Sequence, residues 1–219
     1  MFQSQAQINK TKDESSDRHP NSIHFSHWYI GGGFIFGSSE GKGGEVTPLG
    51  NNYFEMGFRY KFKIAEAIAI GADVSYFNYW FKLKQDSSKV LPTNDINDKE
   101  KLKFNSLILS PYLRIKYKSN GDMMGKFIDL GGYFGYMYKS KHYTYNKHDI
   151  ANEAGGSNTE TYNNNLVFTE DLVYGLNTRI GLGHFILTAK YRLSDLFKED
   201  YIFPELPRFM VGIEVGLHE

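Results

Sequence analysis

The chain has 219 residues, which fits a single domain, and its 25 Lys and Arg residues balance 25 Asp and Glu residues. Zero net charge argues against a nucleic-acid-binding protein, which needs a basic excess, and the absence of cysteine excludes disulfides and thiolate chemistry. No apolar stretch reaches the ~18–20 residues that a transmembrane helix requires.

Residues 1–23 are polar and are expected to form a disordered leader. Ser4 and Ala6 are small residues spaced as they are before a secretory cleavage site, although the charged and apolar regions of a signal peptide are missing. The first residues are therefore interpreted either as the remnant of a signal peptide or as an arbitrary polar tail. Residues 24–219 are expected to form one domain.

From Phe25 onward, apolar and polar residues alternate with a period of two, which is typical of strands with two unlike faces. The alternation is clearest in segment 51–64, where Phe54, Met56 and Phe58 share one face and Glu55 lies on the other. The same pattern predicts eight strands, in segments 28–36, 51–64, 68–76, 106–117, 128–141, 172–180, 185–193 and 208–217. The fifth of them places Lys139 and Lys141 on the same face as Asp129.

The expected connections alternate in length. Short ones lie near residues 65–66, 119–125 and 181–183, and long polar ones near 38–50, 85–101, 141–165 and 194–207. This asymmetry is typical of membrane β-barrels, which have tight periplasmic turns and longer outer loops. An even number of strands then puts both termini on the periplasmic side and the long loops outside the cell.

Alternation by itself does not say which face meets water. A soluble barrel of the lipocalin type buries its apolar face, whereas a membrane barrel exposes it. Large aromatic residues near the ends of the strands favour the membrane, because they resemble the two aromatic girdles at the membrane surfaces. They are Trp28, Tyr60, Phe62 and Tyr117 at one end and Phe36, Phe54, Tyr76, Tyr138 and Tyr191 at the other.

Segments 28–36, 53–63, 107–117 and the terminal strand resemble the small outer-membrane barrels of OmpA/OmpX-like architecture, in particular the outer-membrane β-barrel domain and PorT-like proteins of Bacteroidota. That family usually ends in Gly-x-x-apolar-x-aromatic. Residues 212–217 match the spacing, but Leu217 replaces the aromatic residue and two residues follow it. The resemblance implies an all-β fold, an eight-stranded antiparallel up-and-down transmembrane β-barrel in contact with lipid of the Gram-negative outer membrane.

In such a barrel the polar face of the strands points inward and forms an interior charge network. The expected members are Glu55, Arg59, Lys61, Asp73, Arg114, Lys116, Asp129, Arg179, Lys190, Arg192 and Glu214. They are interpreted either as an ion path or as a structural plug of paired charges. The plug is favoured, because eight strands leave room only for side chains and unpaired buried charges are costly.

Other candidate sites are weaker. His24, His27, His142 and His148 lack the spacing of metal ligands, and segment 95–98 lacks the Gly and distant Glu of a calcium loop, so no metal or cofactor is expected. Ser38 or Ser39 with His142 would supply a nucleophile and a base, but no catalytic motif surrounds them. No enzymatic activity is expected.

The favoured function is that of a non-enzymatic structural or interaction protein. It would be an accessory subunit of a larger envelope complex for secretion, uptake or barrel assembly, with other outer-membrane proteins as partners. Tyrosine is favoured at interfaces, so the expected contact residues are Tyr138, Tyr143, Tyr145 and Tyr162. The alternatives are a lipid-A-modifying outer-membrane enzyme and a soluble lipocalin-like ligand carrier.

Overall fold

A computed structural model describes residues 19–120, 123–147, 158–182 and 185–217. These residues form nine β-strands and no helix. The strands are β1 (His24–Phe36), β2 (Asn52–Lys63), β3 (Ile68–Lys82), β4 (Lys99–Asn120), β5 (Met123–Lys147), β6 (Asn158–Asn164), β7 (Leu172–Leu182), β8 (Phe185–Arg192) and β9 (Phe209–Leu217). The expected signal-peptide remnant and His148 lie outside the described residues.

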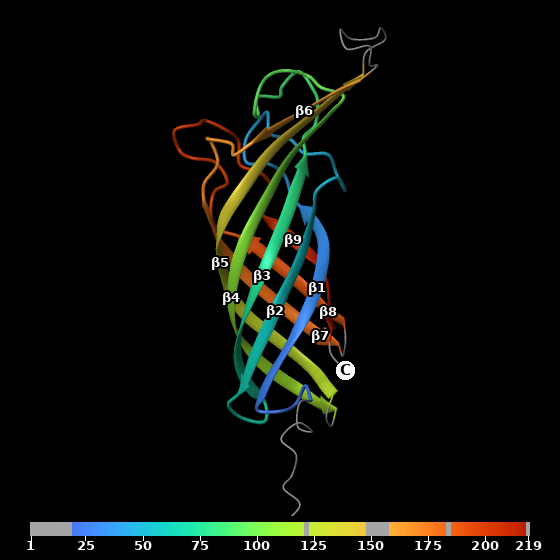
Figure 1. Cartoon of the computed structure of the whole chain (residues 1–219), viewed down its shortest axis with the longest axis vertical. Helices are drawn as coiled ribbons and strands as arrows, with labels where there is room; N and C mark the ends of the chain where they lie inside the picture. Colours follow the sequence, from blue (N-terminus) through green and yellow to red (C-terminus); the bar gives the residue numbers. More distant parts are fainter. Residues whose placement is uncertain (1–18, 121–122, 148–157, 183–184, 218–219) are drawn as a thin grey trace, which may run out of the picture.

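The strands form one antiparallel sheet that closes into a ring. The order β4-β3-β2-β1-β9-β8-β7-β5 is completed by pairing of β4 with β5. Strand β7 pairs with residues 126–136 of β5, and β6 pairs with residues 141–147 of the same strand. Figure 1 shows the resulting elongated molecule, with β6 and the adjoining parts of β4 and β5 extending beyond the level at which β7 completes the ring.

The eight expected strands all occur and form the ring, but the sheet has a ninth strand, because β6 falls in segment 141–165, where the sequence predicts a loop. All seven residues of β6 are exposed. Since neither face of β6 is buried, no apolar alternation marks the strand in the sequence.

The two ends of the ring differ, and we name them the turn end and the loop end. At the turn end, residues 64–67 connect β2 to β3, and Leu217 near the end of the chain pairs opposite Trp28 of β1. At the loop end lie the connections 37–51, 83–98 and 193–208, together with segment 165–171 between β6 and β7.

Around the ring, exposed apolar residues on the outer faces of the strands form a continuous belt, which we call the apolar band. In β2, exposed residues such as Phe54 and Phe58 alternate with buried Glu55, Arg59 and Lys61. Exposed aliphatic and aromatic residues continue this band on every strand of the ring, and examples are Trp28, Phe34, Ile70, Val74, Leu109, Leu113, Leu130, Phe134, Leu176, Ile180, Leu187, Val211 and Ile213. No helix in the described part of the chain is long and apolar enough to cross a membrane.

The polarity of the two faces reverses near the loop end. On β3, Phe77, Tyr79 and Phe81 are buried inside the ring, while Asn78 and Lys82 lie on the outer face. On β4, Leu102 and Phe104 are likewise fully buried. Beyond the apolar band the sheet therefore has the polarity of an ordinary soluble protein.

A β-bulge in β5 contributes to this reversal. Ser106 of β4 pairs with Met137, but Asn105 pairs with Lys139, so Tyr138 is an extra residue in β5. One extra residue moves all following side chains to the opposite face. The expectation that Lys139 and Lys141 share a face with Asp129 is therefore wrong: Asp129 lies inside the ring and the two lysines lie outside it.

Candidate functional site

A network of buried ion pairs fills the middle of the ring. Arg59 of β2 donates to both carboxylate oxygens of Asp73 on β3, at 2.9 and 3.1 Å, and to Glu214 of β9 at 2.7 Å. Its guanidinium also lies 4.3 Å from the ring centre of Tyr29. Strand pairing places Arg59 directly opposite Asp73, so the register of β2 and β3 fixes this contact.

The same network continues to the opposite wall. Arg179 of β7 contacts Asp73 and lies 3.4 Å from Asp129. Asp129 in turn accepts two hydrogen bonds from Arg114, at 2.7 and 2.9 Å. Three arginines and three carboxylates, all almost completely buried, thus form one chain of charges with no net charge. Such pairing offsets the cost of removing the charges from water.

A second buried pair lies beside the first network. Glu55 of β2 contacts Lys190 of β8 and accepts hydrogen bonds from Tyr29 and Ser75, each at 2.9 Å. The ammonium group of Lys190 also lies 5.0 Å from the ring centre of Phe77. This pair marks the level at which the charged part of the interior meets the apolar part.

The three remaining cations of the expected network lie toward the two ends. Arg192 binds Glu205 of connection 193–208 at 2.7 Å. At the turn end, Lys61 donates to the carbonyl of Pro20 at 2.7 Å and Lys116 donates to Asn21. Lys116 is half-buried, whereas the other ten expected members are buried.

Interior glycines make room for the aromatic side chains that surround these charges. A Cβ atom on Gly181 would lie 2.1–2.5 Å from the ring of Phe127, and the guanidinium of Arg114 covers that ring at 3.5 Å. A Cβ atom on Gly71 would similarly meet the ring of Tyr112 at 2.4 Å. Aromatic residues, guanidinium groups and glycines therefore fit together as one packed interior.

Sequence reasoning missed the apolar cluster that occupies the interior toward the loop end. Its buried members are Ile35, Tyr53, Phe77, Tyr79, Phe81, Leu83, Leu91, Leu102, Phe104, Ile108, Tyr133, Met137, Val173, Leu196, Phe197, Leu206 and Met210. Segment 76–83 contains the signal that could have revealed this cluster. Phe77, Tyr79 and Phe81 are separated from the inward-facing Asp73 by even numbers of residues, so the alternation places these apolar side chains on the inner face.

The long connections close the loop end over this cluster. Connection 37–51 pairs with connection 193–208 through Glu40 and Glu205, and with connection 83–98 through Val46 and Leu83. Segment 165–171 pairs with connection 193–208 through Thr169 and Phe197. Leu83, Leu91, Leu196 and Leu206 from these connections are each at most 2% exposed, so the loops carry part of the core.

A small polar cluster lies on the inner face beside the apolar one. Glu100 of β4 contacts His142 of β5 at 2.7 Å and Lys89 of connection 83–98 at 2.6 Å. Burial raises the pKa of Glu100, but the hydrogen bonds from His142 and Lys89 outweigh it, so the pKa lies below its usual range. Within the described residues, no three His, Asp or Glu side chains come together in a metal-binding group.

The four tyrosines expected at an interface do not form one group. Tyr143 of β5 and Tyr162 of β6 are cross-strand partners with ring centres 5.0 Å apart. Tyr145 lies two residues further along β5, where the ammonium group of Lys99 is 5.1 Å from its ring centre. Tyr138 instead occupies the bulge at the edge of the apolar band. The β5–β6 extension thus presents three of the four tyrosines.

The residues considered for catalysis have other contacts. His142 is buried against Glu100, and the Ser39 hydroxyl group lies 3.5 Å from the carbonyl of Gly41. In segment 95–98, Asp98 accepts a hydrogen bond from the backbone of Lys147 at 2.6 Å.

A comparison of the sequence with models of known protein families and with curated proteins finds no match.

Proposed function

We propose that this chain is a non-enzymatic β-barrel of the Gram-negative outer membrane that acts as a structural and interaction protein in an envelope complex. One observation carries the proposal: over most of its height the closed sheet has its charges inside and its apolar side chains outside. Trp28, Phe134 and Leu176 are each 55% exposed, although burial in an apolar environment would stabilise such side chains.

The packed interior supports a structural role over conduction. The charge chain from Glu214 to Arg114 crosses the middle of the ring, and the apolar cluster with its covering loops lies above it. An eight-stranded ring holds only its own side chains, and these residues fill it. The protein therefore acts through its outer surface and its loop end.

The experiment for the membrane proposal is cell fractionation, followed by gel electrophoresis of boiled and unboiled samples in detergent. We expect the chain in the outer-membrane fraction and a different mobility after boiling, because a closed sheet resists unfolding by detergent until heated. Recovery in the aqueous fraction without detergent would instead support the lipocalin-like carrier.

The β5–β6 extension is the proposed contact for a protein partner. Tyr143, Tyr145 and Tyr162 lie at the loop end, where β6 pairs with the outer part of β5 and β5 pairs with the start of β4, and aromatic residues of this kind dominate binding energies. The test is chemical crosslinking of the chain to its partner in intact cells. We expect the double variant Tyr143→Ala with Tyr162→Ala to lose most of the crosslinked product. The matched control is Tyr201→Ala in connection 193–208, which should leave the crosslinked product unchanged.

A further inference from the structure

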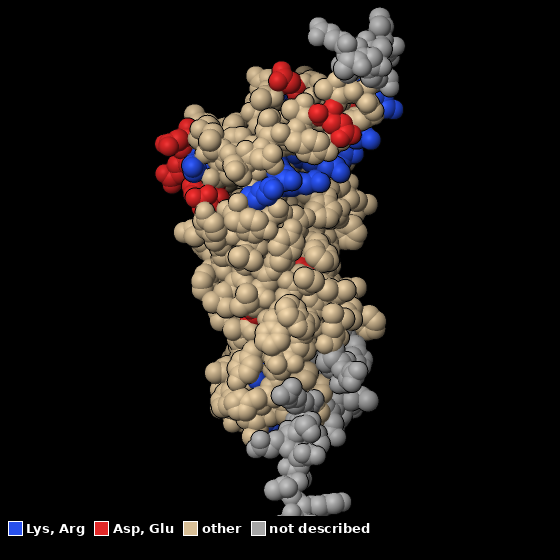
Figure 2. Space-filling view, viewed as in Figure 1, with Lys and Arg blue, Asp and Glu red and all other residues tan. Residues whose placement is uncertain are grey.

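A row of five lysines crosses the outer face of β3, β4 and β5 just beyond the apolar band. We call it the lysine row: Lys82, Lys101, Lys103, Lys139 and Lys141. Lys82 pairs directly opposite Lys101, and Lys103 directly opposite Lys141. Figure 2 shows the row as a continuous blue stripe between the apolar surface and the loop end.

The arrangement of the lysine row is unfavourable by itself. Cβ atoms of directly opposed residues lie about 5 Å apart, and like charges in such positions destabilise a sheet. Partial burial, followed by the positive charges of Lys103, Lys82 and Lys99, lowers the pKa of Lys101. None of the five ammonium groups forms an ion pair with a carboxylate in residues 19–120, 123–147, 158–182 or 185–217.

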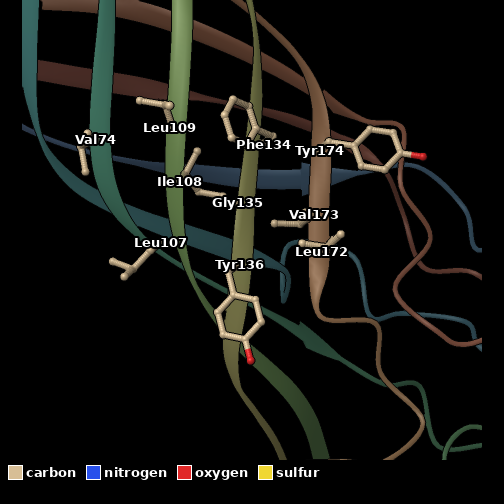
Figure 3. A pocket seen from close by; sticks show the side chains of 10 residues that line it. All are labelled: Val74, Leu107, Ile108, Leu109, Phe134, Gly135, Tyr136, Leu172, Val173 and Tyr174. Carbon is tan, nitrogen blue, oxygen red and sulfur yellow. The ribbon is translucent and has the colours of Figure 1, made fainter.

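An apolar groove lies on the same strands, below the row. Leu107 and Leu109 of β4 form one wall, and Phe134 and Tyr136 of β5 stand beside them, as Figure 3 shows. With Leu172 and Tyr174 of β7 they enclose about 470 Å³. The groove begins four residues from Lys103, about 13 Å along the strand.

A polar cleft lies next to the row. It measures about 330 Å³ and separates the bulge of β5 from segment 165–171. Lys139 and Lys198 line it together with one carboxylate, Asp171. The cleft extends the cationic surface toward the loop end.

We propose that the lysine row and the groove form one binding site for a phosphorylated lipid of the outer leaflet, with phosphate on the lysines and an acyl chain in the groove. This inference rests on the proposed function, because it places the apolar band in a membrane. Charge complementarity and the adjacency of cationic and apolar surfaces favour a lipid over an acidic protein, which would leave the groove empty. The bulge at Tyr138 is part of the site, because it brings Lys139 and Lys141 to the outer face.

The test uses the full chain in neutral maltoside micelles, titrated with dioleoyl phosphatidic acid and with dioleoyl phosphatidylcholine, with bound lipid counted by native mass spectrometry. We expect tighter binding of phosphatidic acid, weakened by salt. Lys103→Gln with Lys141→Gln should weaken it about tenfold or more, because two of the five cations of the lysine row are removed. The matched control, Lys42→Gln with Lys126→Gln, removes the same charge elsewhere and should bind like the unchanged protein.

A groove variant tests the second half of the site. Leu109→Trp fills the groove and should weaken the binding of phosphatidic acid without changing the weak binding of water-soluble glycerol phosphate. Two results would overturn the proposal. One is an equal loss of phosphatidic acid binding in the lysine-row variant and in the control variant, and the other is binding of glycerol phosphate as tight as that of the lipid. Binding of polyglutamate but not of phosphatidic acid would show an acidic protein partner and overturn it as well.

Each variant is also run boiled and unboiled on a detergent gel, which separates the two proposals. A heat-dependent shift together with unchanged lipid binding in the row variant rejects the lipid site and leaves the barrel proposal standing. Absence of the shift in the unchanged protein rejects the barrel proposal itself.

Discussion

The two halves of the ring differ in the side chains that the same strands direct inward, which are charged in one half and apolar in the other. Toward the turn end, Arg59, Asp73 and Arg179 lie inside and apolar residues lie outside. Toward the loop end, Tyr79 and Phe104 lie inside and lysines lie outside. The strands run through both halves, so the surroundings of the sheet, and not the strand geometry, decide which side chains each face carries. On the proposed function, the change marks the boundary between lipid and water.

The largest expected effect comes from breaking the charged half. Asp73→Ala leaves Arg59 and Arg179 without their shared carboxylate, and an uncompensated buried charge costs about 3–5 kcal/mol. We expect the free energy of unfolding, measured by urea titration in lipid vesicles, to fall by that amount. Glu66→Gln is the control, because the Lys63–Glu66 pair is exposed and should contribute under about 1 kcal/mol. Similar small losses in both variants would contradict the structural role of the network.

The apolar half should respond to loss of volume. Leu102 is completely buried, and its replacement by Ala should lower the free energy of unfolding by about 3 kcal/mol through lost burial and the cavity left behind. Leu49→Ala, at a side chain that is 72% exposed, is the control. The Leu102→Ala loss should be unchanged in 0.5 M salt. If salt altered the loss at Leu102, the apolar description of this half would be wrong.

Overpacking tests how tightly the charged half is filled. Gly181→Ala places a methyl group against Phe127, and such crowding costs about 1–3 kcal/mol. Phe127→Leu removes the ring that the methyl group would meet, so the double variant should lose less than the sum of the two single losses. Strictly additive losses in the same urea titrations would mean that the two residues do not touch.

The smallest expected effect depends on pH and concerns Glu100 at the loop end. Since the folded pKa is lowered, the charged carboxylate stabilises the fold above the usual glutamate pKa, and this contribution disappears as the pH falls through the folded value. Glu100→Gln should therefore cost about 1.5 kcal/mol at pH 7 and progressively less below about pH 4. A cost that stays constant down to pH 3 would assign the effect to packing instead of charge. Gln85→Ala removes one of the hydrogen bonds that lower the pKa of Glu100, so it should show a smaller cost that disappears over the same pH range.

Much of the fold could be predicted from the sequence, because the apolar band imposes a period of two on each strand that crosses it. The alternation of Phe54 and Phe58 with Glu55 and Arg59 places the network residues on one face without any structure. Partner choice could not be predicted, because Asp73 meets Arg179 only through ring closure between strands distant in sequence.

Local irregularities account for the errors. The bulge at Tyr138 adds one residue to β5, so the residues after it face the side of the sheet opposite to the one that strict alternation predicts. Nothing in the composition of segment 136–141 indicates this bulge. Strand β6 has solvent on both faces, so its sequence carries no amphipathic pattern. The apolar cluster was missed because the strands were expected to end near the edge of the apolar band, whereas β3, β4 and β5 continue well beyond it.

On the proposed function, the length of β5 sets how far the molecule reaches from the membrane surface. Eight residue steps separate Lys139 in the lysine row from Lys147 at the end of β5, about 26 Å along an extended strand. Pairing with β4 as far as Tyr145 and with β6 from Lys141 to Lys147 keeps this span in a sheet. If the lysines lie at the lipid headgroups, the last residues of β5, from Tyr145 to Lys147, extend beyond them, whereas Tyr162 pairs with Tyr143, which lies opposite Lys101 of the lysine row. On that placement a partner at the level of the headgroups can contact Tyr143 and Tyr162, whereas contact with the end of β5 requires a partner that extends further outward.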